Sequence, residues 1–126
     1  MNVVSPRLIS GLDSLDVVRA RIRDWIADSL SSPELDKDVW RAHLYGAGLA
    51  TPGWPLEYGG LGLGPDAAQV VNEELAISGA PVPFNLVTVR MVGAVLMKLG
   101  SREQCDRYLT PLAEGRHTWV QLFSEP

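Results

Sequence analysis

The stretch from Thr51 to Pro65 constrains the fold more than any other part of this 126-residue chain. Glycine or proline occupies about half of its positions, and neither residue supports the interior of a helix or of a central strand. A loop of this length in a compact domain is generally functional, or is packed by its own side chains. Trp54, Leu56 and Tyr58 are the side chains that could anchor it against neighbouring helices.

Two helices are predicted before this loop. Apolar residues recur at three- and four-residue steps over residues 14–30, which is the pattern of an amphipathic helix. Ser32-Pro33 is typical of a helix start, with serine at the cap and proline in the first turn. We therefore expect a second helix from this point to about Gly46 or Gly48.

Three more helices are predicted after the loop, over residues 65–78, 84–99 and 101–113. Gly79 and Gly100 are placed to end the first two of these helices. Ser101 and Gln104 match a capping box that opens the last one. Together the five helices define an all-α fold, an orthogonal or up-and-down bundle with a long Gly/Pro loop.

The character of the sequence changes over residues 117–123, where β-branched and aromatic side chains such as Trp119 and Val120 favour a strand. A lone strand has no hydrogen-bonding partner in a helical bundle. We therefore expect this strand to belong to a β-domain that is missing from these residues. On this interpretation residues 1–116 form a helical domain and residues 117–126 begin a middle β-domain.

Charge and composition argue against several classes of function. Eleven basic residues against fifteen acidic ones give a net charge of -4, which disfavours a nucleic-acid-binding surface. No apolar run is long enough to span a bilayer, and residues 1–10 lack the continuous apolar segment of a signal peptide. The single cysteine, Cys105, excludes an internal disulfide. These features indicate a cytoplasmic chain without a membrane span.

The titratable residues form no recognisable catalytic or metal-binding pattern. Glu73 and Glu74 are adjacent, but successive helical residues point about 100° apart, so they cannot serve one site as acid and base. We favour a solvated or structural role, with one of them buried beside an arginine. His43 and His117 lie far apart without further ligands, which argues against a metal site. The glycines of residues 59–64 match no phosphate-binding loop and predict a structural turn.

The fourth predicted helix is apolar around most of its circumference, and this leaves two interpretations. It could be a central core helix, which is the usual meaning of such a pattern. Alternatively, one of its faces could line a hydrophobic pocket. On this second interpretation Gly93 would let a neighbouring backbone segment or a ligand approach the helix closely.

The order of these segments resembles the N-terminal domain of acyl-CoA dehydrogenases over nearly the whole chain. Four stretches carry the resemblance: Gly48–Gly60, Glu73–Leu75, Leu99–Leu109 and Trp119–Pro126. The resemblance implies an all-α domain followed by a β-domain and a C-terminal four-helix bundle. It also implies that FAD lies between the β-domain and the bundle of a neighbouring subunit.

The resemblance further implies a reaction and its binding residues. In this family a carboxylate base removes the α-proton of an acyl-CoA thioester while the β-hydride passes to FAD, and the product is a 2,3-enoyl-CoA. The electrons then leave to an electron-transfer flavoprotein. By resemblance, the flavin contacts are Gln121, Phe123 and Ser124, and the acyl-cavity wall is formed by Val87, Met91 and Val95, which share one helix face at four-residue spacing.

Family members continue beyond the Ser-Glu-Pro at residues 124–126, and the usual catalytic glutamate comes later. We therefore assign no catalytic residue and no metal ligand here, expect these residues alone to be inactive, and expect homo- or hetero-oligomers through further domains. Two functions stay open. The chain is the N-terminal domain of an FAD-dependent acyl-CoA dehydrogenase, or it is a non-catalytic helical interaction module, such as a subunit of a heteromeric dehydrogenase. The acyl chain length and the choice between dehydrogenase and oxidase also stay open.

Overall fold

A computed structural model describes residues 8–82, 86–120, 122 and 124. The described residues form five α-helices and one short 3₁₀ turn, η1, and the prediction of an all-α fold is confirmed. The elements in chain order are α1 (Leu15–Leu30), α2 (Lys37–Gly46), η1 (Leu56–Tyr58), α3 (Pro65–Ser78), α4 (Leu86–Leu99) and α5 (Arg102–Ala113).

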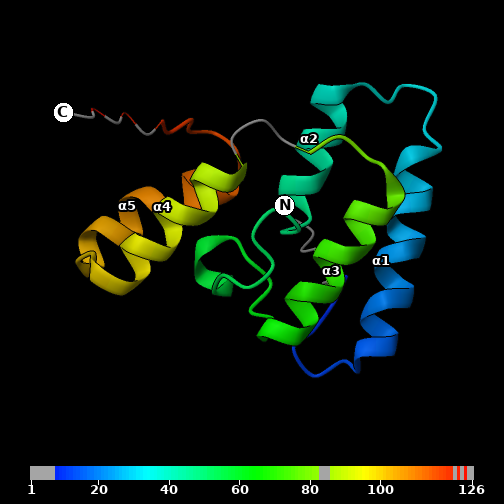
Figure 1. Ribbon diagram of the computed structural model, residues 1–126, viewed down its shortest axis with the longest axis horizontal. Helices are drawn as coiled ribbons and strands as arrows, with labels where there is room; N and C mark the ends of the chain where they lie inside the picture. Colours follow the sequence, from blue (N-terminus) through cyan, green and yellow to red (C-terminus); the bar gives the residue numbers. More distant parts are fainter. Residues whose placement is uncertain (1–7, 83–85, 121, 123, 125–126) are drawn as a thin grey trace, which may run out of the picture.

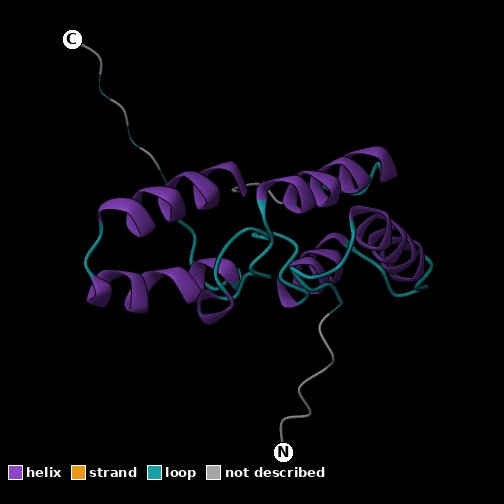
Figure 2. Ribbon diagram, turned by 90° about the horizontal axis from the view of Figure 1, so that it is seen from below, coloured by secondary structure: helices purple, strands orange, loops and turns teal. Residues whose placement is uncertain are grey.

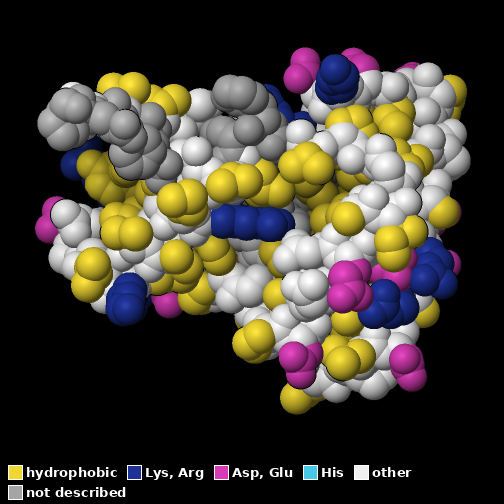
Figure 3. All heavy atoms as spheres, in the orientation of Figure 1, with side chains coloured by type: hydrophobic (Ala, Val, Ile, Leu, Met, Phe, Trp, Pro, Cys, Tyr) yellow, Lys and Arg dark blue, Asp and Glu magenta, His cyan; other side chains and the backbone are white. Residues whose placement is uncertain are grey.

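The helices form two groups with the Gly/Pro loop between them (Figures 1 and 2). In one group α1 packs along α3, and α2 lies beside α1. In the other group α4 and α5 lie side by side, joined by the short turn at Gly100. Figure 3 shows many hydrophobic side chains exposed over the α4–α5 half of the molecule.

Most helix ends lie where the sequence predicts them. Gly79 ends α3 in a left-handed conformation with φ 70°, which costs glycine little. At the start of α5, the Gln104 N–H donates to Ser101 Oγ at 3.1 Å, and the Ser101 N–H donates to Gln104 Oε1 at 2.9 Å. The predicted capping box is therefore confirmed.

The predicted start of α2 at Ser32-Pro33 is wrong. The helix begins at Lys37, and the carboxylate of Asp36 caps it by accepting the N–H groups of Asp38 and Val39 at 2.9 and 2.8 Å. The Ser32 carbonyl instead accepts the Leu35 N–H at 3.2 Å, which closes a turn. An ionised carboxylate satisfies two free amides at the positive end of the helix, so Asp36 is the stronger cap.

The predicted strand over residues 117–123 is also not formed in the part of this segment that the structure describes. Residues 117–120, 122 and 124 are irregular, because no neighbouring strand is available to hydrogen-bond with them. Trp119 packs instead against Tyr108 of α5, edge to face, with 5.3 Å between the ring centroids. The division into domains at residue 116 stays a prediction.

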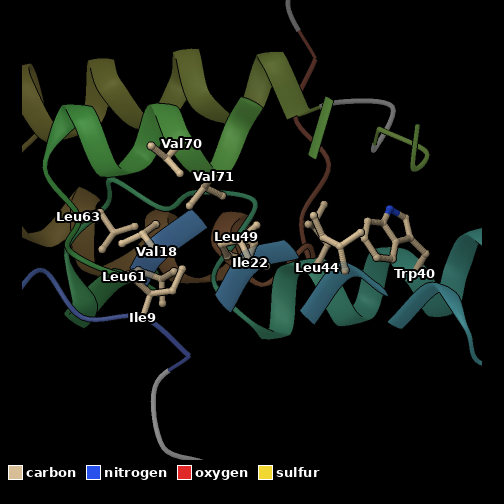
Figure 4. Packing of buried hydrophobic residues seen from close by; sticks show 11 residues of the cluster. Ile9, Val18, Ile22, Trp40, Leu44, Leu49, Leu61, Leu63, Val70 and Val71 are labelled. Atoms are coloured by element: carbon tan, nitrogen blue, oxygen red, sulfur yellow. The ribbon is translucent and has the colours of Figure 1, made fainter. Parts of the chain in front are cut away.

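The larger hydrophobic cluster fills the space between α1, α2, α3 and the second half of the Gly/Pro loop (Figure 4). Side chains from all four segments point toward one another in this view. The loop contributes Leu61 and Leu63, so it is part of the core rather than a surface connection. The cluster comprises Ile9, Val18, Ile22, Ile26, Trp40, Leu44, Leu49, Leu61, Leu63, Val70 and Val71.

An ion-pair network ties α1 to α3 beside this cluster. Glu74 is 3% exposed, and its carboxylate accepts hydrogen bonds from Arg19 Nη1 at 2.8 Å, Arg23 Nη2 at 2.9 Å and Arg23 Nε at 3.1 Å. The hydrogen bonds from Arg23 and then Arg19 hold the pKa of Glu74 below its ordinary value. The expectation that one of the two adjacent glutamates is buried beside an arginine is confirmed.

We predict that Glu74→Gln lowers the free energy of unfolding near neutral pH. Because the folded-state pKa is lowered, the contribution of the carboxylate is complete above the ordinary value of 4.5 and is lost as the pH falls from there through the lowered pKa. Urea unfolding over a pH series should therefore show that the difference in free energy of unfolding between the parent chain and the variant becomes smaller below pH 4.5.

Glu73→Gln is the matched control. Glu73 is the neighbouring residue on α3, is 43% exposed, and accepts one Arg19 hydrogen bond at 2.9 Å. Its replacement should have a much smaller effect, because exposed ion pairs contribute little to stability. A gap for Glu74→Gln that stays constant over the whole pH series would contradict the ionic role of this residue.

Candidate functional site

An exposed apolar stripe runs along α4. Val87, Met91 and Val95 are 70%, 47% and 58% exposed, and their four-residue spacing places them above one another on one helix face. Leu99 continues the stripe by one further turn. The structure therefore brings the three predicted acyl-contact residues together on one surface.

The opposite face of α4 is buried. Leu86, Val89 and Gly93 of α4 lie inside, and Val89 joins a second hydrophobic cluster with Leu109 and Leu112 of α5. About half of the helix circumference is therefore exposed. The interpretation of α4 as a central core helix is wrong, because Val87 and Val95 on its outward face are largely exposed.

Trp54 from the Gly/Pro loop determines how closely the loop approaches α4. Its ring is 7% exposed and lies directly on Gly93, where a Cβ atom would overlap the indole. A Cβ atom at Gly60 would likewise overlap the backbone of Trp54. Gly93 does permit a close approach, as predicted, but the neighbour is the Trp54 side chain and not the backbone segment or ligand that was expected. Tyr58, on the same loop, packs in the second cluster and donates its hydroxyl to Asp106 of α5 at 3.3 Å.

Arg90 links α4 to the first group of helices. Its Nε donates to the Ala50 carbonyl at 3.0 Å, and its Nη2 donates to Asn72 Oδ1 of α3 at 3.0 Å. Burial lowers the pKa of Arg90 from its ordinary value. Arg90 was not among the residues predicted to be functional, although an arginine flanked by apolar residues in the middle of this helix was a signal that could have identified it.

The predicted flavin contacts are only partly within the described residues. Gln121 and Phe123 lie outside them, and Ser124 lies in an exposed irregular segment beside Leu122. The described residues of this segment do not enclose a flavin, so we derive no step of a reaction from them. The cofactor role of these three residues stays a prediction.

The described part of the chain shows neither an acid–base pair in its open hollow nor a metal-binding cluster. An open hollow of about 770 Å³ lies between α1, α2 and the loop, and His43 is the one titratable side chain that lines it. The hollow therefore offers no acid–base pair. No group of three or more His, Cys, Asp or Glu among the described residues could hold a metal ion. None of the described helices combines the length and apolar character needed to cross a membrane.

Comparison with known proteins identifies the class of protein. Residues 15–116 match the family model described as acyl-CoA dehydrogenase, N-terminal domain. This match extends over most of the chain and includes all five helices. The chain therefore belongs to the acyl-CoA dehydrogenase N-terminal domain family, and the resemblance seen in the sequence is confirmed.

Three curated relatives illustrate the match. Acyl-CoA dehydrogenase IpdE1 of Mycolicibacterium smegmatis is 32% identical over 124 residues, which cover 86% of this chain and 32% of that protein. IpdE1 of Mycobacterium tuberculosis is 28% identical over 131 residues, covering 91% of this chain and 34% of that protein. Acyl-CoA dehydrogenase FadE34 of Mycobacterium tuberculosis is 31% identical over 118 residues, which cover 92% of this chain and 16% of that protein. The chain thus spans about a third of the length of the two IpdE1 proteins. No solved structure matches it significantly.

We predict that Gly93→Ala destabilises the fold, because the added methyl group overlaps the Trp54 ring. Overpacking of this kind typically lowers the free energy of unfolding by about 1–3 kcal/mol. Urea unfolding measures the change, and Gly46→Ala in the last turn of α2 is the control, since a Cβ atom there has no neighbour within 4 Å. Equal stability of the two variants would contradict close packing of Trp54 on α4.

Proposed function

We propose that this chain forms a helical wall of the acyl-binding cavity in an FAD-dependent acyl-CoA dehydrogenase. The observation that carries the proposal is the exposed stripe of Val87, Met91 and Val95 on α4, in a chain that belongs to this family. Apolar side chains in a continuous row leave water favourably when an acyl tail covers them. This proposal adopts the second interpretation of α4 that the sequence left open, a helix with one face lining a hydrophobic pocket.

The dimensions of the stripe suit an acyl tail. Val87 and Val95 are separated by two turns of α4, which corresponds to a length of about 12 Å along the helix axis. Several methylene groups can lie along such a row, and each one buried contributes about 0.8 kcal/mol. The wall therefore favours binding and excludes water from the tail without any polar contact.

The chemistry of the proposed reaction comes from groups outside the described stripe. Lys98 is the one charged side chain on the exposed face of α4, and no carboxylate lies among the residues of that helix. The proposed oxidation of an acyl-CoA to a 2,3-enoyl-CoA needs a carboxylate base held against the α-carbon. A bound FAD would supply the hydride acceptor. In this proposal the described residues bind and orient the substrate, and the electrons pass on to an electron-transfer flavoprotein.

The proposal predicts that Val95→Trp changes the chain-length preference of the assembled flavoprotein. The larger side chain fills space along the stripe, so kcat/KM for long acyl-CoA substrates should fall by about tenfold or more relative to short ones. The measurement is turnover of an acyl-CoA series with an artificial electron acceptor. Ile77→Trp is the control, because Ile77 is 75% exposed on α3 and lies outside the stripe.

Two results would contradict the proposal. One is an equal loss of kcat/KM for every chain length. The other is loss of assembly by Val95→Trp in size-exclusion chromatography, which would identify the stripe as a contact between polypeptides and favour the alternative of an interaction module.

A further inference from the structure

A second, smaller pocket lies between α2, the C-terminal half of α3 and the start of α4, with a volume of about 130 Å³. Most of its lining is apolar, no Asp or Glu side chain lines it, and two polar side chains, Asn72 and Arg90, reach it from neighbouring helices. The pocket is lined by Trp40, Leu44, Asn72, Leu75, Ala76, Ala80, Pro81, Val82, Leu86 and Arg90.

Two hydrogen bonds hold the guanidinium of Arg90 in place, and they do not use all of its N–H donors. Nε and Nη2 donate to Ala50 and Asn72, and both acceptors are neutral. Nη1 has no acceptor in the described part of the chain. An arginine has five N–H groups, so the edge formed by Nη1 and the second N–H of Nη2 is available. This edge matches the two oxygens of a carboxylate.

The charge around Arg90 is unbalanced. Arg19, Arg21 and Arg23 each form an ion pair with a carboxylate, whereas Arg90 forms none with any described residue. A second guanidinium, Arg41 of α2, acts together with Arg90 on the phenol of Tyr45 and opposes the rise in its pKa that burial causes. A partly buried cation in a carboxylate-free pocket attracts an anion more strongly than one in water.

We propose that Arg90 and this pocket bind a carboxylate group carried on a short apolar chain. The volume of the pocket equals that of about four molecules of liquid water, and a chain of three or four carbons fits such a space. Arg90 follows Val87 by three residues on α4, so the pocket adjoins the acyl-binding stripe. The identification of this carboxylate as the far end of an acyl group rests on the proposed function, whereas the binding site itself does not.

The test is a titration of the ¹⁵N-labelled chain with butyrate, and separately with butyramide, at constant ionic strength. The reporter is the indole N–H of Trp40, which lines the pocket and donates to the Pro81 carbonyl at 2.7 Å. Butyrate should shift this resonance saturably, and butyramide should bind about tenfold more weakly because it cannot accept two charge-assisted hydrogen bonds. Since both ligands are tested on the unmodified chain, this comparison does not depend on the folding of any variant.

Arg90→Gln should abolish the saturable shift, and Arg90→Lys should weaken it, because lysine lacks the planar fork. Lys98→Gln is the matched control, since it removes the same charge from the exposed face of the same helix and should leave the titration unchanged. Equal affinity for butyrate and butyramide would overturn the proposal, and so would a shift that persists in Arg90→Gln. Neither flavin nor a thioester takes part, so a failure here leaves the proposed dehydrogenase function untouched.

Discussion

The contact between Trp54 and Gly93 is the packing on which the arrangement of the two helix groups depends. The indole is large and nearly buried, and it needs a flat helix surface without a side chain at the point of contact. Glycine supplies this surface at the middle of α4. Once that face of α4 lies on the loop and on α5, the opposite face must point outward. The exposure of Val87 and Val95 is therefore a consequence of the loop's packing.

The two halves of the molecule are stabilised by different interactions. The α1–α3 half combines a hydrophobic cluster with the hydrogen bonds from Arg19 and Arg23 to buried Glu74. The α4–α5 half relies on apolar packing around Trp54 and on the linking hydrogen bonds of Arg90. The α1–α3 half is stabilised by its own core and ion pairs, and the hydrogen bonds of Arg90 attach the α4–α5 half to it. This arrangement suits a domain that presents one helix face to a ligand, because binding surfaces work best on rigid elements.

Local signals in the sequence predicted most of the fold. The features that the sequence did not predict depend on contacts between residues far apart in the chain. The capping box of Ser101 and Gln104 is a local signal and was predicted correctly, whereas the acyl-contact role of Val87, Met91 and Val95 stays a prediction. The start of α2 was predicted wrongly. Ser32 and Asp36 are both acceptable N-caps, and which of them caps the helix depends on contacts made in the folded chain. Arg90 stands out locally as an arginine among apolar residues, but its acceptors Ala50 and Asn72 lie 40 and 18 residues away along the chain, so no local pattern predicts which groups it links.

Photochemical cross-linking can show whether the outward face of α4 forms a wall of the acyl cavity. The assembled flavoprotein containing this chain would be irradiated with an acyl-CoA that carries a diazirine at the far end of its acyl group, and the adducts mapped by mass spectrometry. If α4 forms this wall, adducts are expected on the α4 peptide at Val87, Met91 or Val95. Adducts confined to α1, α2 or α3, or none on this chain while the enzyme turns over, would contradict it.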